Sequence, residues 1–314
     1  MKKNKAFSLV ELSVVILIIG ILVAGVTQSG RLIRQIKLST ARSVTASSDV
    51  ASIRDVTAWF EASTEGNFTD INNVTDIENK AVVLEWRDIN PQKPIGDRPK
   101  LRNEASGSQP MYIANGINGI PSVYFNTDDH IYTTDAPTMP LLSKDKTYSM
   151  FAVFRADLGK VQTKSIITQI GSNTTLANNQ YASIGFLGSA NNNGKVGFIT
   201  NSTENNNWIQ NTRISDQKDY IVGVLADLTG TVAQSSVKLY VNSLIAETNF
   251  PVGGTYATTD IDAKRFSVGA SAIASPADFF NGMVSEVIIF DRKIKDEEAE
   301  SVMKYLRKKY NINS

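Results

Sequence analysis

The chain has 314 residues, of which 20% are charged and 42% are hydrophobic, a balance typical of a globular protein and not of a disordered one. The formal net charge of +1 gives no indication of nucleic acid as a bulk electrostatic partner. The sequence contains no cysteine, which excludes disulfides, thiolate metal sites and thiol nucleophiles, and His130 is its one histidine.

Residues 1–6 form a short basic segment ahead of a long apolar run at residues 7–26. The run is apolar or small throughout, except for Glu11 and two serines. A helix of about 20 residues is about 30 Å long, which is the thickness of the hydrocarbon core of a bilayer. The lysines of the first segment predict a cytoplasmic N-terminus, so the chain from about Thr27 onward is expected outside.

Glu11 is unusual in a membrane span, because a carboxylate at the centre of the span costs about 2.5–3.5 kcal/mol on insertion scales and less near the interface. A signal peptide would have a shorter apolar core and a small-x-small cleavage site, and a plain anchor has no use for Glu11. Cleavage between Ala6 and Phe7 would place a new amino group one helical turn from Glu11. The two charges could then compensate each other within one chain or between neighbouring chains, and so set the register of packed helices.

The stretch "KAFSLVELSVVILIIGIL" resembles the prepilin-type cleavage and methylation signal of type IV pilins and of the pseudopilins of type II secretion. The resemblance covers about residues 2–30. It implies that Ala6 precedes the scissile bond, that Phe7 becomes the N-methylated first residue, and that Glu11 becomes the fifth. The family usually has glycine at the position of Ala6. The implied partners are a prepilin peptidase/N-methyltransferase and other pilin-like subunits, and the alternative is an uncut anchor.

Residues 27–50 are predicted to form a stalk that continues the helix. An amphipathic helix is expected to about Ala46, and the alternative is a solvated linker. Its apolar stripe consists of Leu32, Ile33, Ile36, Ala41 and Val44.

Residues 51–314 change pattern, since short β-rich runs such as "YSMFAVF", "YIVGVLA" and "MVSEVIIF" alternate with polar turn clusters. Only the last segment, "KDEEAESVMKYLRKKY", reads as a helix, with acids in its first turn and lysines in its last. Because no βαβ alternation occurs, the prediction is a mainly β protein. It consists of an N-terminal transmembrane and stalk helix, an antiparallel β-sandwich and a short C-terminal helix.

Several stretches of this region, above all "NGINGIPSVYFNTDD" and the run from Phe280 to Tyr310, resemble concanavalin A-like, laminin G-type jelly rolls of bacterial surface proteins. The resemblance covers about residues 57–312. It implies the fold and leaves the function open, because the fold is found in lectins, adhesion modules, hydrolases and spacers.

Glycoside hydrolases on this fold use two carboxylates that point the same way from one strand. No predicted strand carries acids with a period of two, and Glu286 stands alone in "VSEVIIF". We therefore expect no catalytic residues and no enzyme activity.

Two further clusters are candidates for binding. Asp128 and Asp129 could hold calcium in a loop with backbone carbonyls, although an acidic turn is the favoured interpretation; no other cofactor is expected.

Trp59 and Trp86 lie in apolar strand contexts and are predicted to be core residues. Trp208 lies among asparagines, with Asn206 and Asn207, and is predicted to be an exposed aromatic that could stack on a sugar.

The sequence thus predicts a pilin-like or pseudopilin-like subunit of a type IV pilus or type II secretion-type filament. It would be a single-pass protein of the bacterial cytoplasmic membrane, or reach the cell surface within a filament. Its jelly-roll domain would be extracytoplasmic and serve adhesion or recognition of glycans or surface proteins. The alternative is a membrane-tethered glycan- or protein-binding module that forms no filament.

Overall fold

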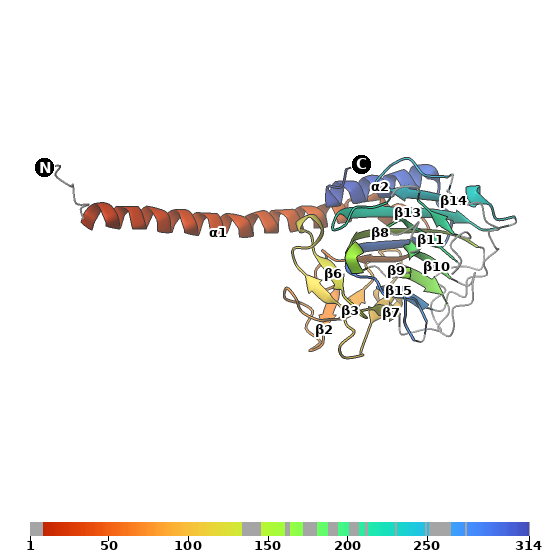
Figure 1. The fold of residues 1–314 in the computed structure, drawn as a ribbon, viewed down its shortest axis with the longest axis horizontal. Helices are drawn as coiled ribbons and strands as arrows, with labels where there is room; N and C mark the ends of the chain where they lie inside the picture. Colours follow the sequence, from red (N-terminus) through yellow and green to blue (C-terminus); the bar gives the residue numbers. More distant parts are fainter. Residues whose placement is uncertain are drawn as a thin grey trace.

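The computed structural model of the chain describes residues 9–133, 146–160, 164–171, 181–187, 194–200, 207–210, 213–229, 231–248, 250, 265–273 and 275–313. It consists of a long N-terminal helix, two antiparallel sheets and a C-terminal helix (Figure 1). The predicted mainly β fold class is confirmed.

The N-terminal helix, α1 (Leu9–Ala46), projects away from the remainder of the molecule, and we call it the stem (Figure 1). The described residues from 47 onward form a compact body that we call the head. A short 3₁₀ helix, η1 (Asp49–Ser52), connects the stem to the first strand. With 38 residues, α1 is about 57 Å long, so it exceeds the hydrocarbon thickness of a bilayer.

Two sheets form the head. In the described part of the chain the first sheet has seven strands and the second has nine, and the described strand pairs are antiparallel. The first sheet has the order β14 (Val237–Val241), β13 (Asp219–Asp227), β8 (Thr147–Ala156), β16 (Gly282–Phe290), β6 (Ser122–Phe125) and β5 (Met111–Ile113), and β1 (Val56–Glu61) also pairs with β16. The second has the order β12 (Trp208–Ile209), β11 (Val196–Ile199), β10 (Ala182–Leu187), β9 (Lys164–Gly171), β15 (Arg265–Val268), β7 (Ile131–Thr133), β4 (Lys100–Arg102), β3 (Val83–Arg87) and β2 (Phe68–Asp70). The described parts of the connections contain four further 3₁₀ turns, η2 (Ile95–Asp97), η3 (Ile117–Gly119), η4 (Leu158–Lys160) and η6 (Gln234–Ser236).

The central strand β8 shows how the sequence builds three layers. Successive side chains of a strand point to opposite faces, and both faces of β8 are apolar. Met150 and Phe154 lie in the cluster between the two sheets, and Phe151 and Val153 lie in a second cluster on the outer face of the first sheet. The first sheet is therefore covered on both sides, like the buried strands of a layered fold.

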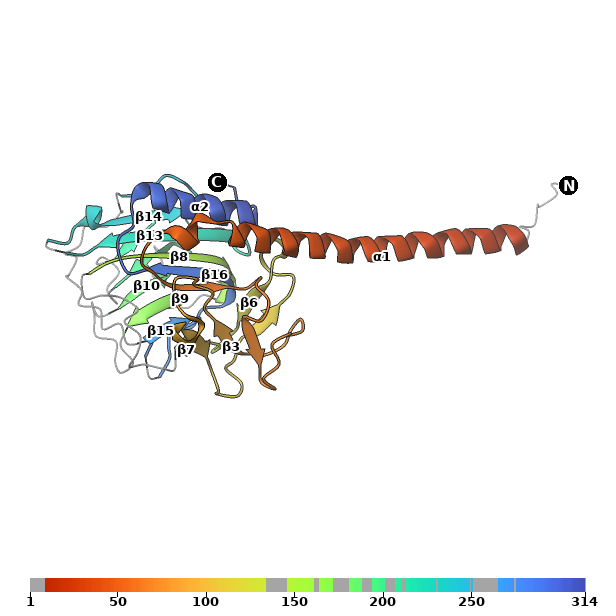
Figure 2. The ribbon, with the colours of Figure 1, turned by 180° about the vertical axis from the view of Figure 1, so that it is seen from behind.

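The outer cover of the first sheet is made by α2 (Asp296–Tyr310), η1 and the last turns of the stem. Seen from behind, α2 and the end of α1 lie side by side over β13, β8 and β16 (Figure 2). Acidic residues occupy the first turn of α2 and basic residues its last turn, as the helix dipole favours. Asn311, directly after the helix, adopts the left-handed conformation common at helix C-termini.

Candidate functional site

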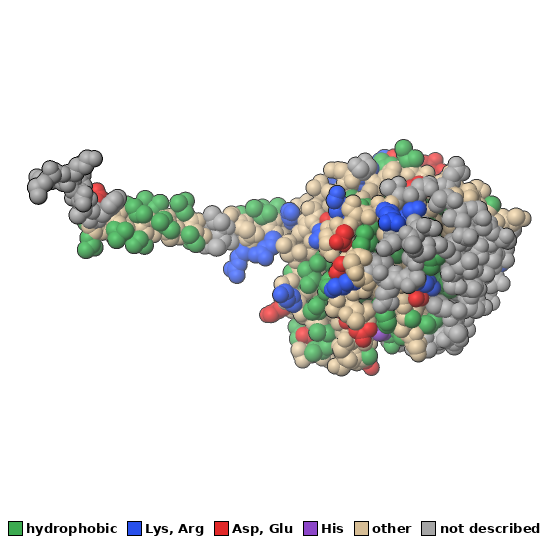
Figure 3. All heavy atoms as spheres, viewed as in Figure 1, with side chains coloured by type: hydrophobic (Ala, Val, Ile, Leu, Met, Phe, Trp, Pro, Cys, Tyr) green, Lys and Arg blue, Asp and Glu red, His purple; other side chains and the backbone are tan. Residues whose placement is uncertain are grey.

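The outer half of the stem presents its apolar side chains to the surroundings. Leu9, Leu17 and Leu22 are exposed, as are the other large hydrophobic residues up to Val23 (Figure 3). By length and composition this helix could cross a membrane. Glu11 lies in its first turn. Ala6 and Phe7, the predicted processing residues, lie outside the described residues.

The inner half of the stem carries exposed basic residues between the apolar part and the head, where Figure 3 shows blue side chains. They are Arg31, Arg34 and Lys37. The change from apolar to basic side chains marks where a membrane-spanning helix would enter a polar environment.

The last turns of the stem are packed on α2. The Ala41 side chain is only 2% exposed, and it belongs to the cluster that includes Met303 and Leu306 of α2. Thr45 Oγ1 lies 3.1 Å from Tyr305 Oη, with both hydroxyls buried. The stem is therefore held by the C-terminal helix through both apolar packing and a hydrogen bond.

Two basic side chains of the stem extend this attachment. Lys37 Nζ donates to the carbonyl of Asn118 in η3 at 3.3 Å. Arg42 Nε donates to the carbonyl of Ser63 at 2.7 Å, and its guanidinium pairs with Glu65. The stem thus contacts α2, η3 and the segment after β1, which lie far apart in the sequence.

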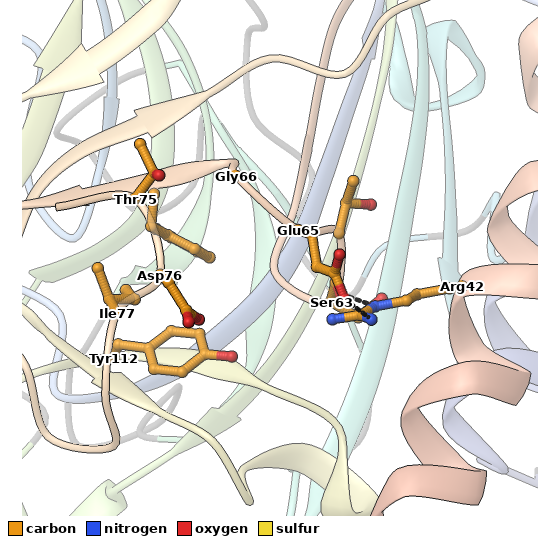
Figure 4. A pocket seen from close by; sticks show the side chains of 10 residues that line it. Arg42, Ser63, Glu65, Gly66, Thr75, Asp76, Ile77 and Tyr112 are labelled. Carbon is orange, nitrogen blue, oxygen red and sulfur yellow. Dashed lines mark hydrogen bonds and ion pairs between the residues drawn. The ribbon is translucent and has the colours of Figure 1, made fainter.

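Beside this attachment lies a polar cavity of about 410 Å³ (Figure 4). Arg42 and Glu65 form one wall, and Asp76 and Tyr112 lie on the other. Burial raises the pKa of Tyr112 to about 12, so its hydroxyl is a neutral donor at ordinary pH. The cavity therefore offers an aromatic ring together with charged and hydroxyl groups, a combination suited to polar ligands.

Below the attachment, the head contains a buried ionic cluster. Glu61 of β1 and Glu286 of β16 are partners in the strand register. Lys309 of α2 lies between them, with its Nζ 2.6 Å from Glu61 Oε1 and 2.8 Å from Glu286 Oε2. All three side chains are 0% exposed. We call these three residues the buried triad.

A β-bulge in β16 explains why Glu286 faces the helix layer. The register against β8 shifts between Val284 and Glu286. Val284 and Val287 point into the core between the sheets, whereas Ile288 points to the outer face with Glu286. A regular strand would turn residues 284 and 286 to the same face, so the bulge redirects the carboxylate toward α2.

Both oxygens of the Glu286 carboxylate accept hydrogen bonds. Its Oε1 accepts hydrogen bonds from Trp59 Nε1 and Tyr305 Oη, each at 2.7 Å. Its Oε2 accepts from Lys309 Nζ at 2.8 Å and Tyr310 Oη at 2.9 Å. Because Tyr305 also contacts Thr45, this network extends to the stem.

The two carboxylates of the buried triad differ in pKa. Burial alone would raise the pKa of Glu61, but Lys309 and hydrogen bonds from Ser63 and Thr64 outweigh burial and lower it. Burial raises the pKa of Glu286; the attraction of Lys309 does not offset this, and the charge of Glu61 adds to it. Glu61 is therefore the ionised partner, and Glu286 takes up a proton more readily.

The predicted sugar-stacking residue is buried, so the expectation of an exposed Trp208 is wrong. Trp208 is 0% exposed, lies in β12 opposite Phe198, and belongs to the core between the sheets. Its Nε1 donates to the carbonyl of Gln234 at 3.1 Å. Asn207 is also buried, and its Oδ1 accepts from the Thr200 amide at 2.8 Å, which corrects its assignment to an exposed loop. Asn206 lies outside the described residues.

The other two tryptophans are core residues, as predicted: Trp59 is 2% exposed and Trp86 is 0% exposed.

The predicted calcium cluster, Asp128 and Asp129, lies in a turn. Asp129 Oδ2 accepts from the Asn126 amide at 2.9 Å, and His130 Nδ1 lies 2.8 Å from the Asp128 carbonyl. Burial, with a smaller contribution from Asp128, raises the pKa of Asp129 to about 6. The described residues contain no group of three or more His, Cys, Asp or Glu side chains that could hold a metal ion, and calcium binding by Asp128 and Asp129 with backbone carbonyls stays a prediction.

Comparisons with known proteins show the family of the chain. The sequence model of the concanavalin A-like lectin/glucanases superfamily matches residues 125–300, more than half of the 314 residues. The chain belongs to this superfamily. A second model, of the prokaryotic N-terminal methylation motif, matches residues 1–27, ahead of the concanavalin A-like head. No curated protein sequence matches the chain.

Solved structures resemble the chain at low sequence identity, and the first named here, with a TM-score above 0.5, shares its fold. An arabinofuranosidase complexed with arabinofuranosyl-α-1,2-xylobiose has a TM-score of 0.55 at 11% identity, covering 81% of this chain and 63% of that one. Domain 4 of a GH43 extracellular arabinanase from Geobacillus stearothermophilus, in complex with arabinotriose, has a TM-score of 0.46 at 15% identity, covering 79% and 98%. The NanB sialidase of Streptococcus pneumoniae, bound to Optactamide, has a TM-score of 0.36 at 17% identity over 51% of this chain. The chain spans only 24% of the length of that sialidase.

The buried triad was not predicted from the sequence. Glu286 was noted as an isolated acid, and Lys309 as one of the basic residues at a helix end. One signal was present: an acid in a strand that is otherwise continuously apolar needs a buried partner, and lysines of the amphipathic last segment were available.

Proposed function

We propose that this chain is a pilin-like subunit that is cut after Ala6, methylated at Phe7 and anchored by α1, with the concanavalin A-like head outside the cytoplasmic membrane. The N-terminal methylation motif supports processing by a prepilin peptidase/N-methyltransferase. The head serves adhesion or recognition. The N-terminus faces the cytoplasm before processing.

The observation that carries the proposal is that α1 is one continuous helix with two different surroundings. Its outer half exposes a full circumference of apolar side chains, and its inner end is fastened to the head. A helix that is apolar all round is stable only in lipid or among other helices. Lipid accounts for the apolar surface, and packing against other stems would bring the Phe7 amine of a neighbouring chain close to Glu11 and set the register of the helices.

We propose further that the head is a binding domain and not an enzyme. The two carboxylates that are paired across β1 and β16, Glu61 and Glu286, are 0% exposed and covered by α2, so no substrate reaches them in this arrangement.

A second candidate function is a membrane-tethered glycan- or protein-binding module that forms no filament. The cavity between Arg42 and Tyr112 favours it, because aromatic faces and hydroxyl groups bind sugars well (Figure 4). The arabinofuranosidase with the same fold binds a substituted xylobiose, which makes pentose-containing glycans the first class to test.

The mass of the mature N-terminal peptide tests processing. A peptide that begins with methylated Phe7 is expected, and a chain that retains Met1 overturns the proposal.

Assembly is tested by Glu11→Ala in the organism's own filament system. Insertion and leader cleavage should be retained, whereas co-purification with other pilin-like subunits should be lost. Ser13→Ala, a small change in the next turn of the same helix, is the control. Unchanged assembly of the Glu11 variant would contradict a register role and leave the tethered module as the better description.

Glycan binding is tested on arrays with the detergent-purified full chain. Tyr112→Ala is expected to abolish binding, and Tyr124→Ala, which changes a half-buried tyrosine of β6 that does not line the cavity, should not. Binding that survives loss of Tyr112 would exclude this cavity as the glycan site.

A further inference from the structure

The buried triad places an amine between two carboxyl groups inside the head. Lys309 Nζ lies 2.6 Å from Glu61 Oε1 and 2.8 Å from Glu286 Oε2, and none of the three side chains is exposed. Trp59, Tyr305 and Tyr310 surround them. These are the reactants for an amide bond, held together before any reaction.

We propose that Lys309 and Glu286 form an intramolecular amide bond, in which Lys309 Nζ is joined to Cδ of Glu286 and one water molecule is released. The bond covalently links α2 to β16. It does not depend on whether the chain joins a filament.

Burial provides the driving force. In water, an ammonium ion and a carboxylate are strongly hydrated, which favours the separate ions over the amide. Inside the head this hydration is lost, and desolvation of each ion costs several kcal/mol in effective terms. The amide is neutral, so its burial does not carry the desolvation cost of two ions. The released water molecule leaves for bulk solvent. Holding the two groups in contact also removes the entropy cost of bringing them together.

Glu286 is suited to be the acyl partner. Amide formation requires a neutral carboxyl group, and Glu286 is the carboxyl of the pair that holds a proton more readily. Two donors, Trp59 Nε1 and Tyr305 Oη, each lie 2.7 Å from Oε1, the oxygen that becomes negative when an amine adds to Cδ. Donors aimed at a developing oxyanion are among the largest contributions to acyl-transfer catalysis.

Glu61 is suited to be the proton acceptor. Lys309 must lose a proton before it can attack, and Glu61 Oε1 is the nearer carboxylate oxygen at 2.6 Å. Backbone amides of Ser63 and Thr64 donate to the two oxygens of Glu61 at 2.7 and 2.8 Å, which keeps this carboxylate ionised and in place. A carboxylate held in this way stays ionised and in contact with the ammonium, so it is available to accept the proton and is a poor acyl group.

The atoms and charges of the reaction balance. The ammonium of Lys309 gives one proton to Glu61, and its lone pair then forms the bond to Cδ of Glu286. The bond between Cδ and Oε2 breaks, and Oε2 leaves with its own proton and a second proton from Nζ as water. Tyr310 Oη, 2.9 Å from Oε2, is placed to relay that proton. The products are a neutral amide, a neutral Glu61 and one water molecule.

Peptide mapping of the full chain, purified in detergent and digested with trypsin, tests the proposal. We expect Phe266–Arg292 joined to Lys309–Ser314, with a mass lower by one water than the sum of the two peptides. Fragmentation should locate the link at Glu286 and Lys309. Unlinked Phe266–Arg292 found together with Tyr310–Ser314, which is released only by cleavage after an unmodified Lys309, would overturn the proposal. A link to Asp55–Lys80, which carries Glu61, would overturn the assignment of Glu286 as the acyl group.

Two variants separate the roles. Lys309→Arg keeps the positive charge but cannot form the amide under these conditions, so the linked peptide should disappear. Glu61→Gln keeps the shape and removes the base, and it should slow linkage about 10²-fold or more, since general base catalysis contributes at least that much. Lys304→Arg, an exposed lysine on the same helix, is the control and should leave the link intact. Unimpaired linkage in Glu61→Gln would refute the role of Glu61.

Discussion

Glu61 and Glu286 are direct partners across β1 and β16, and one buried amine, Lys309, contacts both carboxylates. The first strand, the last strand and the C-terminal helix therefore meet at a single charged contact. Removing the Lys309 amine would leave two carboxylates buried without a cation. Removing an exposed amine would leave its partner carboxylate hydrated by solvent.

Relative to Lys309→Arg, which keeps the charge and cannot form the amide, Lys309→Met is expected to destabilise the head by about 3–5 kcal/mol, because loss of the buried cation leaves uncompensated charge. Thermal or urea unfolding of the full chain in detergent measures the change. Lys304→Met is the matched control on the same helix. Lys304 forms an exposed pair with Glu300 one turn away, so its loss should cost about 0.5 kcal/mol or less. Equal stability of the two variants would contradict the assigned importance of the buried triad.

Asp88 predicts a pH dependence. Its Oδ1 accepts from the amides of Trp59 and Asn90 at 2.8 Å each, while Oδ2 is buried and has no hydrogen-bond partner within the described structure. Burial raises the pKa of Asp88 to about 7 from an ordinary value of 3.8. The folded state thus keeps a proton that the unfolded chain releases from about pH 4 upward. The stability contributed by this proton is complete below about pH 4 and is lost as the pH rises to about 7, by up to about 4 kcal/mol.

Asp88→Asn keeps the Oδ1 acceptor and removes the titration. The slope of unfolding free energy against pH between 4 and 7 should become shallower than in the unmodified protein. Asp97→Asn, at an exposed position in η2, serves as control and should leave the slope unchanged. Parallel curves for all three proteins would show that Asp88 does not hold the proton.

Trp208→Ala should destabilise the head by about 3–5 kcal/mol, as removal of a fully buried aromatic side chain from a core does. Ile95→Ala, at a side chain that is 80% exposed, should change stability by about 0.5 kcal/mol or less. The measurement is the unfolding midpoint of each variant. Unchanged stability together with lost glycan binding would restore the hypothesis of a sugar-stacking Trp208.

Ala41→Glu tests the attachment of the stem. Ala41 is 2% exposed against α2, so a carboxylate there would separate the last turns of α1 from the head. Hydrogen exchange of the amides of residues 38–46 should become faster, while the strands of the head keep their protection. Ser39→Glu, at an exposed position of the same helix, should exchange like the unmodified protein. Unchanged exchange in Ala41→Glu would mean that packing at this residue does not hold the stem.

Much of the fold could be predicted from local patterns. The apolar length of the first helix, the strand periodicity of runs such as "YSMFAVF" and the charge order of the last helix each reflect a physical requirement that acts within a few residues. The burial of Trp59 and Trp86 followed from their apolar strand neighbours.

The errors concern contacts between distant segments. Trp208 lies in a strand of only two described residues between Asn207 and Gln210, so its polar sequence neighbours indicated a loop, although pairing with Phe198 buries it. The paired carboxylates were missed because they lie on different strands that become neighbours only when the sheet forms. A bulge at Ser285, which no local pattern indicates, then sets the direction of Glu286.

The contact between Thr45 and Tyr305 has a mechanical consequence. Tension applied to the stem has two routes into the head. One runs through residues 47–55 to β1, and the other runs through the contact between α1 and α2, which lies before that segment begins. The contact with the last helix therefore takes the load first, and residues 47–55 transmit tension to β1 only after that contact breaks. The head would therefore respond to pulling in two stages, with release of the stem first and separation of β1 from β16 second.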